Sequence, residues 1–156
     1  MAFRKGLLSW NFTVMDGQEA VAEIDMSWWH ERGALAVQGR DYPIHREGLV
    51  GGAFFLEGDD AVMARAGKLS VLSRSLEIEH RDRHYVLKRK RAFFNRRFVL
   101  MAGDVEVGSV AVEGIPSRRL RAVLPEDLPL PVRVFIIWLV ALMRKRAAKA
   151  AASSGS

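Results

Sequence analysis

The sequence predicts a mainly β protein, a closed antiparallel barrel built around a buried C-terminal helix. Hairpin-like segments recur along residues 12–110, and ten successive apolar residues follow at 134–143. Length and composition agree with a single domain, because the chain has 156 residues, of which 49% are hydrophobic and 27% charged. These values are typical of globular proteins.

Three segments of the sequence align on a glycine that we expect at a turn. Each has an apolar run, the glycine, a polar residue, and a valine four positions after the glycine. The segments are 12–24, 53–65 and 98–110, and their glycines are Gly17, Gly58 and Gly103. Glycine supplies the positive φ of hairpin turns, and flanks rich in Val, Phe, Ile and Leu suit strands. Each segment is therefore predicted to be a β-hairpin.

A second piece repeats between these hairpins. GRDYPIHR (39–46) and DRHYVLKR (82–89) place their tyrosines 43 residues apart, and RSLEIEH (74–80) alternates apolar and polar residues as a strand does. We expect about ten to twelve strands before Val123, since no long stretch there has a helical period. A β-propeller has a similar repeat length, but two full units and part of a third are too few for its usual four to eight blades.

The segment 124–146 is predicted to hold a helix from about Leu130 to Arg146. Spaced prolines precede it, and proline is tolerated in a first helical turn but not in a helix interior. Ten apolar residues span about 15 Å, whereas a membrane core is ~30 Å thick. A transmembrane span is therefore disfavoured.

Ten consecutive apolar residues leave this helix without a polar face, so it must be covered on all sides. The predicted strands are the available cover. A barrel of more than about eight strands has an interior too wide for its own side chains to fill, and closure removes the sheet edges. We therefore expect the barrel to bury Ile136, Ile137, Leu139 and Val140. Glu126 and Asp127 are expected near the positive helix end.

Glycine-centred hairpins, the GRDY and DRHY strands and the apolar C-terminal helix together resemble the tubby C-terminal-like superfamily. This superfamily includes tubby domains, phospholipid scramblases and LURP-one-related proteins, and the chain is most similar to its small LURP-one-related and bacterial members. The resemblance covers roughly residues 3–147. It implies one barrel domain of about twelve strands around a central helix. Residues 148–156 are then expected to be a disordered tail.

The resemblance implies binding of phosphoinositide-like lipids through cations on barrel strands, or a lipid-handling, scramblase-like role. Scramblases carry a cysteine-rich segment and a calcium-binding acidic stretch. This chain has no cysteine, and the acidic residues ahead of its expected helix are Glu126 and Asp127. The scramblase-like role is therefore the less supported of the two.

The positive charge of the chain is concentrated in one region. The net charge is +6 and the pI about 10.2, and residues 74–97 alone hold nine Arg or Lys against three Asp or Glu. Such a surface favours anionic partners, namely nucleic acid, acidic lipid headgroups or acidic proteins. A genome-wide composition bias toward arginine is the alternative reading, since Arg outnumbers Lys eighteen to six.

The segment KRKRAFFNRR (88–97) is the candidate binding site. Its cations are Lys88, Arg89, Lys90, Arg91, Arg96 and Arg97, and its aromatic residues are Phe93 and Phe94. Arginine suits bidentate contact with phosphate, and exposed aromatics can enter a membrane interface or stack on bases. The leading partner is an anionic phospholipid surface, and the alternatives are a nucleic acid, an acidic protein, or a strand pair whose cations are merely solvated.

Other polar groups are expected to be structural. Arg144–Arg146 would complement the negative helix end, and Asp59 and Asp60 suit a turn. His80 and His84 have a spacing that suits metal binding on a helix, whereas a hairpin is expected there. No catalytic residue, metal or cofactor is predicted. The chain has no cysteine and its N-terminal apolar run is short, so we expect a cytoplasmic protein that associates peripherally with membranes.

Overall fold

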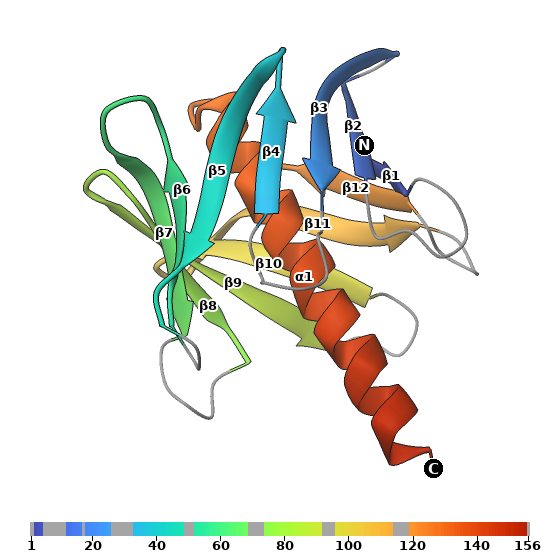
Figure 1. Cartoon of the computed structure of the whole chain (residues 1–156). Helices are drawn as coiled ribbons and strands as arrows, with labels where there is room; N and C mark the ends of the chain where they lie inside the picture. The colour runs from blue at the N-terminus through green and yellow to red at the C-terminus, as the bar shows by residue number, and fades with distance from the viewer. Residues whose placement is uncertain are drawn as a thin grey trace.

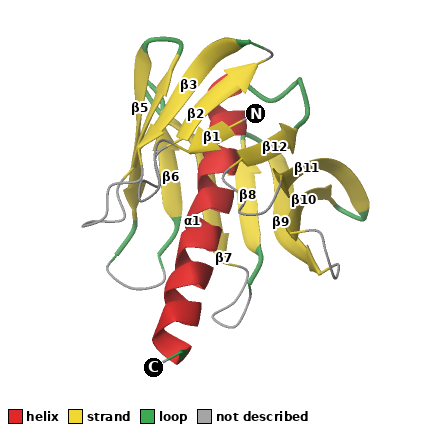
Figure 2. Cartoon of the chain, turned by 90° about the vertical axis from the view of Figure 1, so that its right-hand side faces the viewer, coloured by secondary structure: helices red, strands yellow, loops and turns green. Residues whose placement is uncertain are grey.

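The computed structural model describes residues 2–4, 12–16, 18–25, 33–48, 52–68, 74–91, 96–113 and 119–155. These residues form strands and a single helix, α1 (Leu130–Ser154). In two views at right angles the strands curve around the helix (Figures 1 and 2). The predicted mainly β fold with a C-terminal helix is confirmed.

The strands follow one another in space as they do in the sequence. They are β1 (Ala2–Arg4), β2 (Phe12–Asp16), β3 (Glu19–Asp25), β4 (Gly33–Val37), β5 (Arg40–Arg46), β6 (Phe54–Glu57), β7 (Val62–Lys68), β8 (Leu76–His80), β9 (Arg83–Arg91), β10 (Arg96–Ala102), β11 (Val105–Glu113) and β12 (Arg119–Val123). The eleven strands from β2 to β12 form one antiparallel sheet in which each pairs with the next. β1 pairs with β2 at three positions and with β12 at two.

The alternating strand directions give the sheet two distinct ends. The turns β2–β3, β4–β5, β6–β7, β8–β9 and β10–β11 share one end with the passage from β12 into α1, and we call it the helix-entry end. The helix runs past the strands and leaves at the opposite end, the helix-exit end, where β5, β7 and β9 finish (Figure 2). A charged residue that lies near the end of its strand can therefore be assigned to one end of the sheet.

The three predicted hairpins are present, and they share a β-bulge. The pairing register shifts after Val14 in β2–β3, after Leu56 in β6–β7 and after Leu100 in β10–β11. The extra residues are Val21, Met63 and Val107, and each packs against the core while remaining partly exposed. The aligned valine of the second hairpin, Val62, is 50% exposed instead. The longer β6–β7 turn moves the bulge by one residue, which the sequence alignment could not reveal.

Small residues face large ones just beyond each bulge. Val14, Leu56 and Leu100 are buried and pair with Ala22, Ala64 and Gly108 respectively, which are buried as well. A Cβ atom on Gly108 would lie 2.9 Å from the carbonyl oxygen of Val123. This repeated large–small pairing leaves room for the helix against the inner face of the sheet.

The turn glycines differ in their conformation. Gly103 has φ of +60°, as the hairpin prediction requires. Gly58 has no positive φ, and its N–H donates to the carbonyl oxygen of Ala61 at 2.9 Å. Gly17 lies outside the described residues. The β4–β5 turn contains two positive φ angles, 50° at Gln38 and 77° at Gly39, which is the pattern of a type I′ hairpin.

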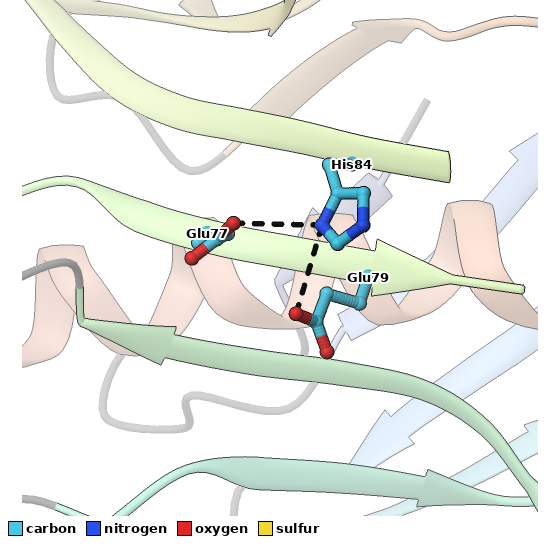
Figure 3. A group of neighbouring side chains, drawn as sticks. All are labelled: Glu77, Glu79 and His84. Atoms are coloured by element: carbon cyan, nitrogen blue, oxygen red, sulfur yellow. Dashed lines mark ion pairs between the residues drawn. The ribbon is translucent and has the colours of Figure 1, made fainter. Parts of the chain in front are cut away.

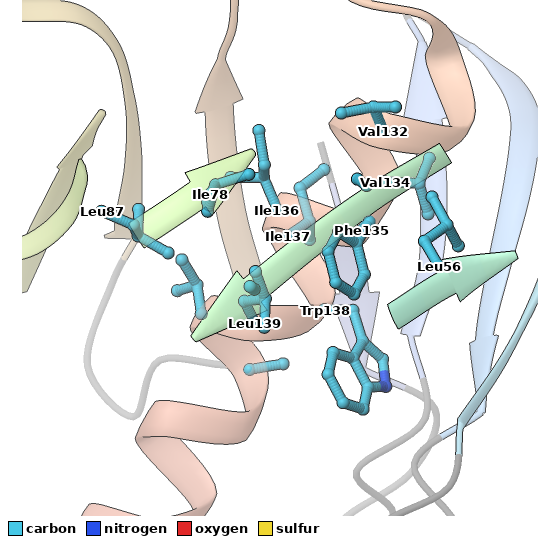
Figure 4. Packing of buried hydrophobic residues seen from close by; sticks show 14 of the residues in the cluster. Leu56, Ile78, Leu87, Val132, Val134, Phe135, Ile136, Ile137, Trp138 and Leu139 are labelled. Carbon is cyan, nitrogen blue, oxygen red and sulfur yellow. The ribbon is translucent and has the colours of Figure 1, made fainter. Parts of the chain in front are cut away.

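The central part of α1 is buried on every side. Nine successive residues, Val134–Leu142, are at most 6% exposed, including the four that we expected to be covered. Nine positions turn through more than two full helical turns, so no direction around this segment reaches solvent. Figure 4 shows Phe135, Ile136 and Leu139 against Leu56, Ile78 and Leu87 of the strands.

The helix is longer than predicted, and its flanking charges are placed differently. It ends at Ser154, so residues 148–154, expected to be a disordered tail, are helical and exposed. The alanines of this segment have the highest intrinsic helix propensity. The cations 144–146 therefore lie inside the helix, where it emerges from the sheet, and not at its end. Glu126 and Asp127 precede the first turn, which begins after Pro129.

Candidate anion-binding surface

The basic segment 88–97 forms the end of the β9–β10 hairpin. Lys88, Arg89 and Lys90 are exposed on β9, and the backbone positions of Arg91 and Arg96 pair with each other at the helix-exit end. Phe93 and Phe94 lie outside the described residues. The structure thus places three of the predicted cations in solvent, at the end of the molecule where the helix emerges.

Two of the predicted cations contact a carboxylate. Arg97 donates to Glu106 of β11, and the Nζ atom of Lys90 is 3.8 Å from another oxygen of the same carboxylate. Both pairs are partly solvent-exposed, so their contribution to stability is small. Lys88 and Arg89 are therefore the predicted cations best placed to meet an external anion.

The helix-entry end is acidic. The described positions at its turns and in the first turn of α1 hold ten Asp or Glu against four Arg. The acidic positions are Asp16, Glu19, Asp41, Glu57, Asp59, Asp60, Asp82, Asp104, Glu126 and Asp127, and the basic ones are Arg40, Arg81, Arg83 and Arg133. Asp59, which we expected to serve a turn, is in the β6–β7 turn and pairs with Arg40.

The helix-exit end has the opposite charge. The described strand ends on this side and the emerging helix hold sixteen Arg or Lys against four Asp or Glu. The basic positions are Arg4, Arg46, Lys68, Arg74, Lys88, Arg89, Lys90, Arg91, Arg96, Arg97, Arg119, Arg121, Arg144, Lys145, Arg146 and Lys149, and the acidic ones are Glu23, Asp25, Glu47 and Glu113. The molecule is therefore polarised along its strands, and the predicted segment 88–97 is one part of a larger basic end.

A second group of cations surrounds Phe54 at the helix-exit end. The guanidinium carbons of Arg46 and Arg146 lie 5.7 Å and 5.6 Å from the centroid of the Phe54 ring. Burial lowers the pKa of both arginines, and the charge of Arg146 lowers the pKa of Arg46 further. Burial also lowers the pKa of Lys145, and Lys149 adds to this effect. These groups are less hydrated than ordinary surface cations.

His80 and His84, which are close in the sequence, lie in different surroundings in the structure. His80 is buried, and its Nδ1 atom is 2.7 Å from the carbonyl oxygen of Met63 at the β7 bulge. His84 is exposed on β9, where its Nδ1 atom lies 3.5 Å from Glu77 and 3.6 Å from Glu79 (Figure 3). Arg65 lies 3.9 Å from Glu79, and its positive charge opposes the binding of a cation at this cluster.

A cavity of about 560 Å³ opens at the helix-entry end between β9, β11 and the turn before α1. Arg83 and Asp127 are among its lining residues, and they form an ion pair. Arg83 holds the pKa of Asp127 below its ordinary value. The ion pair therefore stabilises the folded chain at pH values above the ordinary pKa of a carboxyl group. This stabilisation is lost as the pH falls through the lowered pKa of Asp127. Because Arg83 and Asp127 are paired with each other, neither is suited to act as a general acid or base.

Comparisons with known proteins add no assignment. The chain matches no protein-family model, no curated protein and no solved structure. Among the described residues, the structure contains no helix with the length and apolarity needed to cross a membrane.

Proposed function

We propose that this chain is a non-enzymatic binding module that associates peripherally with anionic phospholipid surfaces through its helix-exit end. The segregation of charge along the strands carries this proposal. An acidic end and a basic end orient the molecule in the field of a negative surface, and each Lys or Arg near such a surface contributes about 1 kcal/mol. The exposed residues Lys88 and Arg89 lead this contact.

The composition of the connecting segments favours lipid over other anionic partners. The sequence segments 5–11, 26–32, 49–51, 69–73 and 92–95, whose structure lies outside the described residues, are rich in Leu, Trp and Phe. They include Leu7, Leu8, Trp10, Trp28, Trp29, Leu49, Val50, Leu69, Val71, Leu72, Phe93 and Phe94. The turns at the helix-entry end consist mainly of Gly, Asp, Gln and Arg. Cations together with aromatic and aliphatic side chains are the composition of interfacial membrane contacts.

The same proposal includes the architecture that the sequence resemblance implies. We propose that the sheet closes into a barrel around α1, as in the tubby C-terminal-like superfamily. The pairing of β1 with both β2 and β12 supports closure, and so does the burial of Val134–Leu142 on every side. The basic helix-exit end would then be one open rim of that barrel.

Co-sedimentation with vesicles tests the function. The wild-type chain should bind phosphatidylglycerol-containing vesicles better than phosphatidylcholine vesicles, and the binding should weaken as salt is raised. Replacing Lys88, Arg89 and Lys90 with Gln should lower the partition coefficient roughly 100-fold. The matched control replaces Arg40, Arg81 and Arg83 with Gln, which removes the same charge from the helix-entry end and should change binding much less.

Three outcomes would overturn the proposal. One is no preference for acidic vesicles at low salt. Another is an equal loss of binding in the two triple variants. A third is steeply salt-dependent binding to DNA or RNA in preference to vesicles, which would favour the nucleic-acid alternative.

A further inference from the structure

The cavity at the helix-entry end has apolar walls and apolar surroundings. Its lining residues include Ala102, Val107 and Pro125, and its volume is about 560 Å³. Val105 and Val123 lie two residues from this lining, and they are 63% and 64% exposed. Exposed apolar side chains that gather around a cavity are typical of a surface that a partner covers. This part of the helix-entry end is therefore a candidate docking surface.

Carboxylates surround the same cavity. Asp82, Asp104 and Glu126 are exposed, and each lies within two residues of the cavity lining. Among the described residues, none of these three carboxylates has an ion-pair partner. Arg81, in the β8–β9 turn, offsets one of the three negative charges. The surroundings of the cavity therefore carry a net negative charge, which favours a positively charged partner.

The exposed end of α1 has the complementary character. Residues 147–154 are helical and exposed, and they project beyond the strands (Figures 1 and 2). The segment consists of alanine, serine and Lys149, and Lys149 has no ion-pair partner among the described residues. Eight helical residues extend about 12 Å. Their small side chains allow the helix to approach an apolar wall closely, while Lys149 can reach the carboxylates around the cavity.

These two surfaces lie at opposite ends of the chain, so they can meet only between two copies. We propose that the exposed end of α1 of one copy docks at the cavity of a second copy. Such a head-to-tail contact leaves one surface of each kind free in every pair, so association continues beyond a dimer. The contact area is small, and the association is therefore weak and reversible. The proposal concerns the chain in solution and does not depend on membrane binding.

Sedimentation velocity of the lipid-free chain at low salt tests this association. The weight-average mass should rise with protein concentration and pass the mass of a dimer. Because salt screens exposed charges, this rise should be lost at high salt. A chain that stays monomeric over the whole concentration series would overturn the proposal. A chain whose association stops at a dimer would overturn the head-to-tail arrangement.

Charge reversal on each surface separates the two sides of the contact. Asp82→Lys with Asp104→Lys alters the surroundings of the cavity, and Lys149→Glu with Ala152→Glu alters the helix end. Each variant alone should raise the apparent Kd of self-association at least about tenfold. An equimolar mixture should regain association, because the first variant retains the wild-type helix end and the second retains the wild-type cavity. A mixture that remains monomeric would overturn the head-to-tail contact.

A matched control separates docking at the cavity from general attraction between the two ends. Glu19→Lys with Asp41→Lys makes the same charge change at the helix-entry end, on β3 and β5, away from the cavity. This control should change the apparent Kd less than about threefold. An equal loss of association in the control and in the cavity variant would overturn the docking site. If circular dichroism shows that the cavity variant is unfolded, Val123→Lys with Glu126→Lys takes its place, and the same outcomes apply.

Discussion

At the residue scale, Ile137 tests whether the helix is enclosed on all sides. It is 4% exposed in the middle of the buried segment. Ile137→Asp should unfold the domain, because a buried charge without a partner costs several kcal/mol or more. Circular dichroism and urea denaturation measure this loss. Ala150→Asp, on the exposed part of the same helix, should stay within about 1 kcal/mol of wild type. A folded, soluble Ile137→Asp protein would refute the enclosure.

Gly108 tests the pairing of large and small residues across the third hairpin. A Cβ atom there would lie 2.9 Å from the Val123 carbonyl oxygen and 3.2 Å from a methyl carbon of Leu124. Because backbone must shift to admit it, Gly108→Ala should lower the free energy of unfolding by about 1–3 kcal/mol. The midpoint of guanidinium unfolding measures the change. The neighbouring Ser109→Ala is the control, and equal midpoints for the two variants would contradict the close approach.

At the element scale, the two parts of α1 should contribute very differently to stability. Residues 148–154 are exposed, so a chain that ends at Ala147 should keep its Tm within about 2 °C of wild type. Leu142→Ala in the buried part should cost about 2–5 kcal/mol. Differential scanning calorimetry compares the two variants. A large loss on truncation would show that the exposed helix is held by contacts to the sheet.

The hairpins and the buried helix could be predicted because each repeats a local pattern. A turn glycine between apolar runs marks a hairpin wherever it occurs, and a helix without a polar face must be covered. The bulge at Met63 and the helix end at Ser154 could not be predicted in this way. The first depends on the number of residues in the β6–β7 turn, and the second on the propensity of an alanine segment that contacts no core.

At the scale of the whole molecule, the polarity of charge depends on strand direction. The segment 88–97 could be identified from the sequence because its cations are contiguous. Arg46, Arg119 and Arg121 come from distant segments and share an end with it only through the pairing of the strands. Their arrangement could therefore be recognised once the topology was known. The aligned hairpins contained the information needed to recognise this basic end, because they determine which strand ends lie together.

The whole-molecule account predicts one orientation on a membrane. The chain has no cysteine, so a single introduced cysteine can carry an environment-sensitive fluorophore without competing labels. Ala34 is the second residue of β4, at the helix-exit end, and Ala61 lies in the β6–β7 turn at the helix-entry end. Both are exposed. The substitutions Ala34→Cys and Ala61→Cys therefore form a matched pair that preserves every charge.

Fluorescence of these two labelled proteins on acidic vesicles is the most direct test. The label at position 34 should shift to the blue and be quenched by spin-labelled lipid, and the label at position 61 should report water with and without vesicles. Response at position 61 alone, or response at neither position while the protein is bound, would contradict membrane association through the basic helix-exit end.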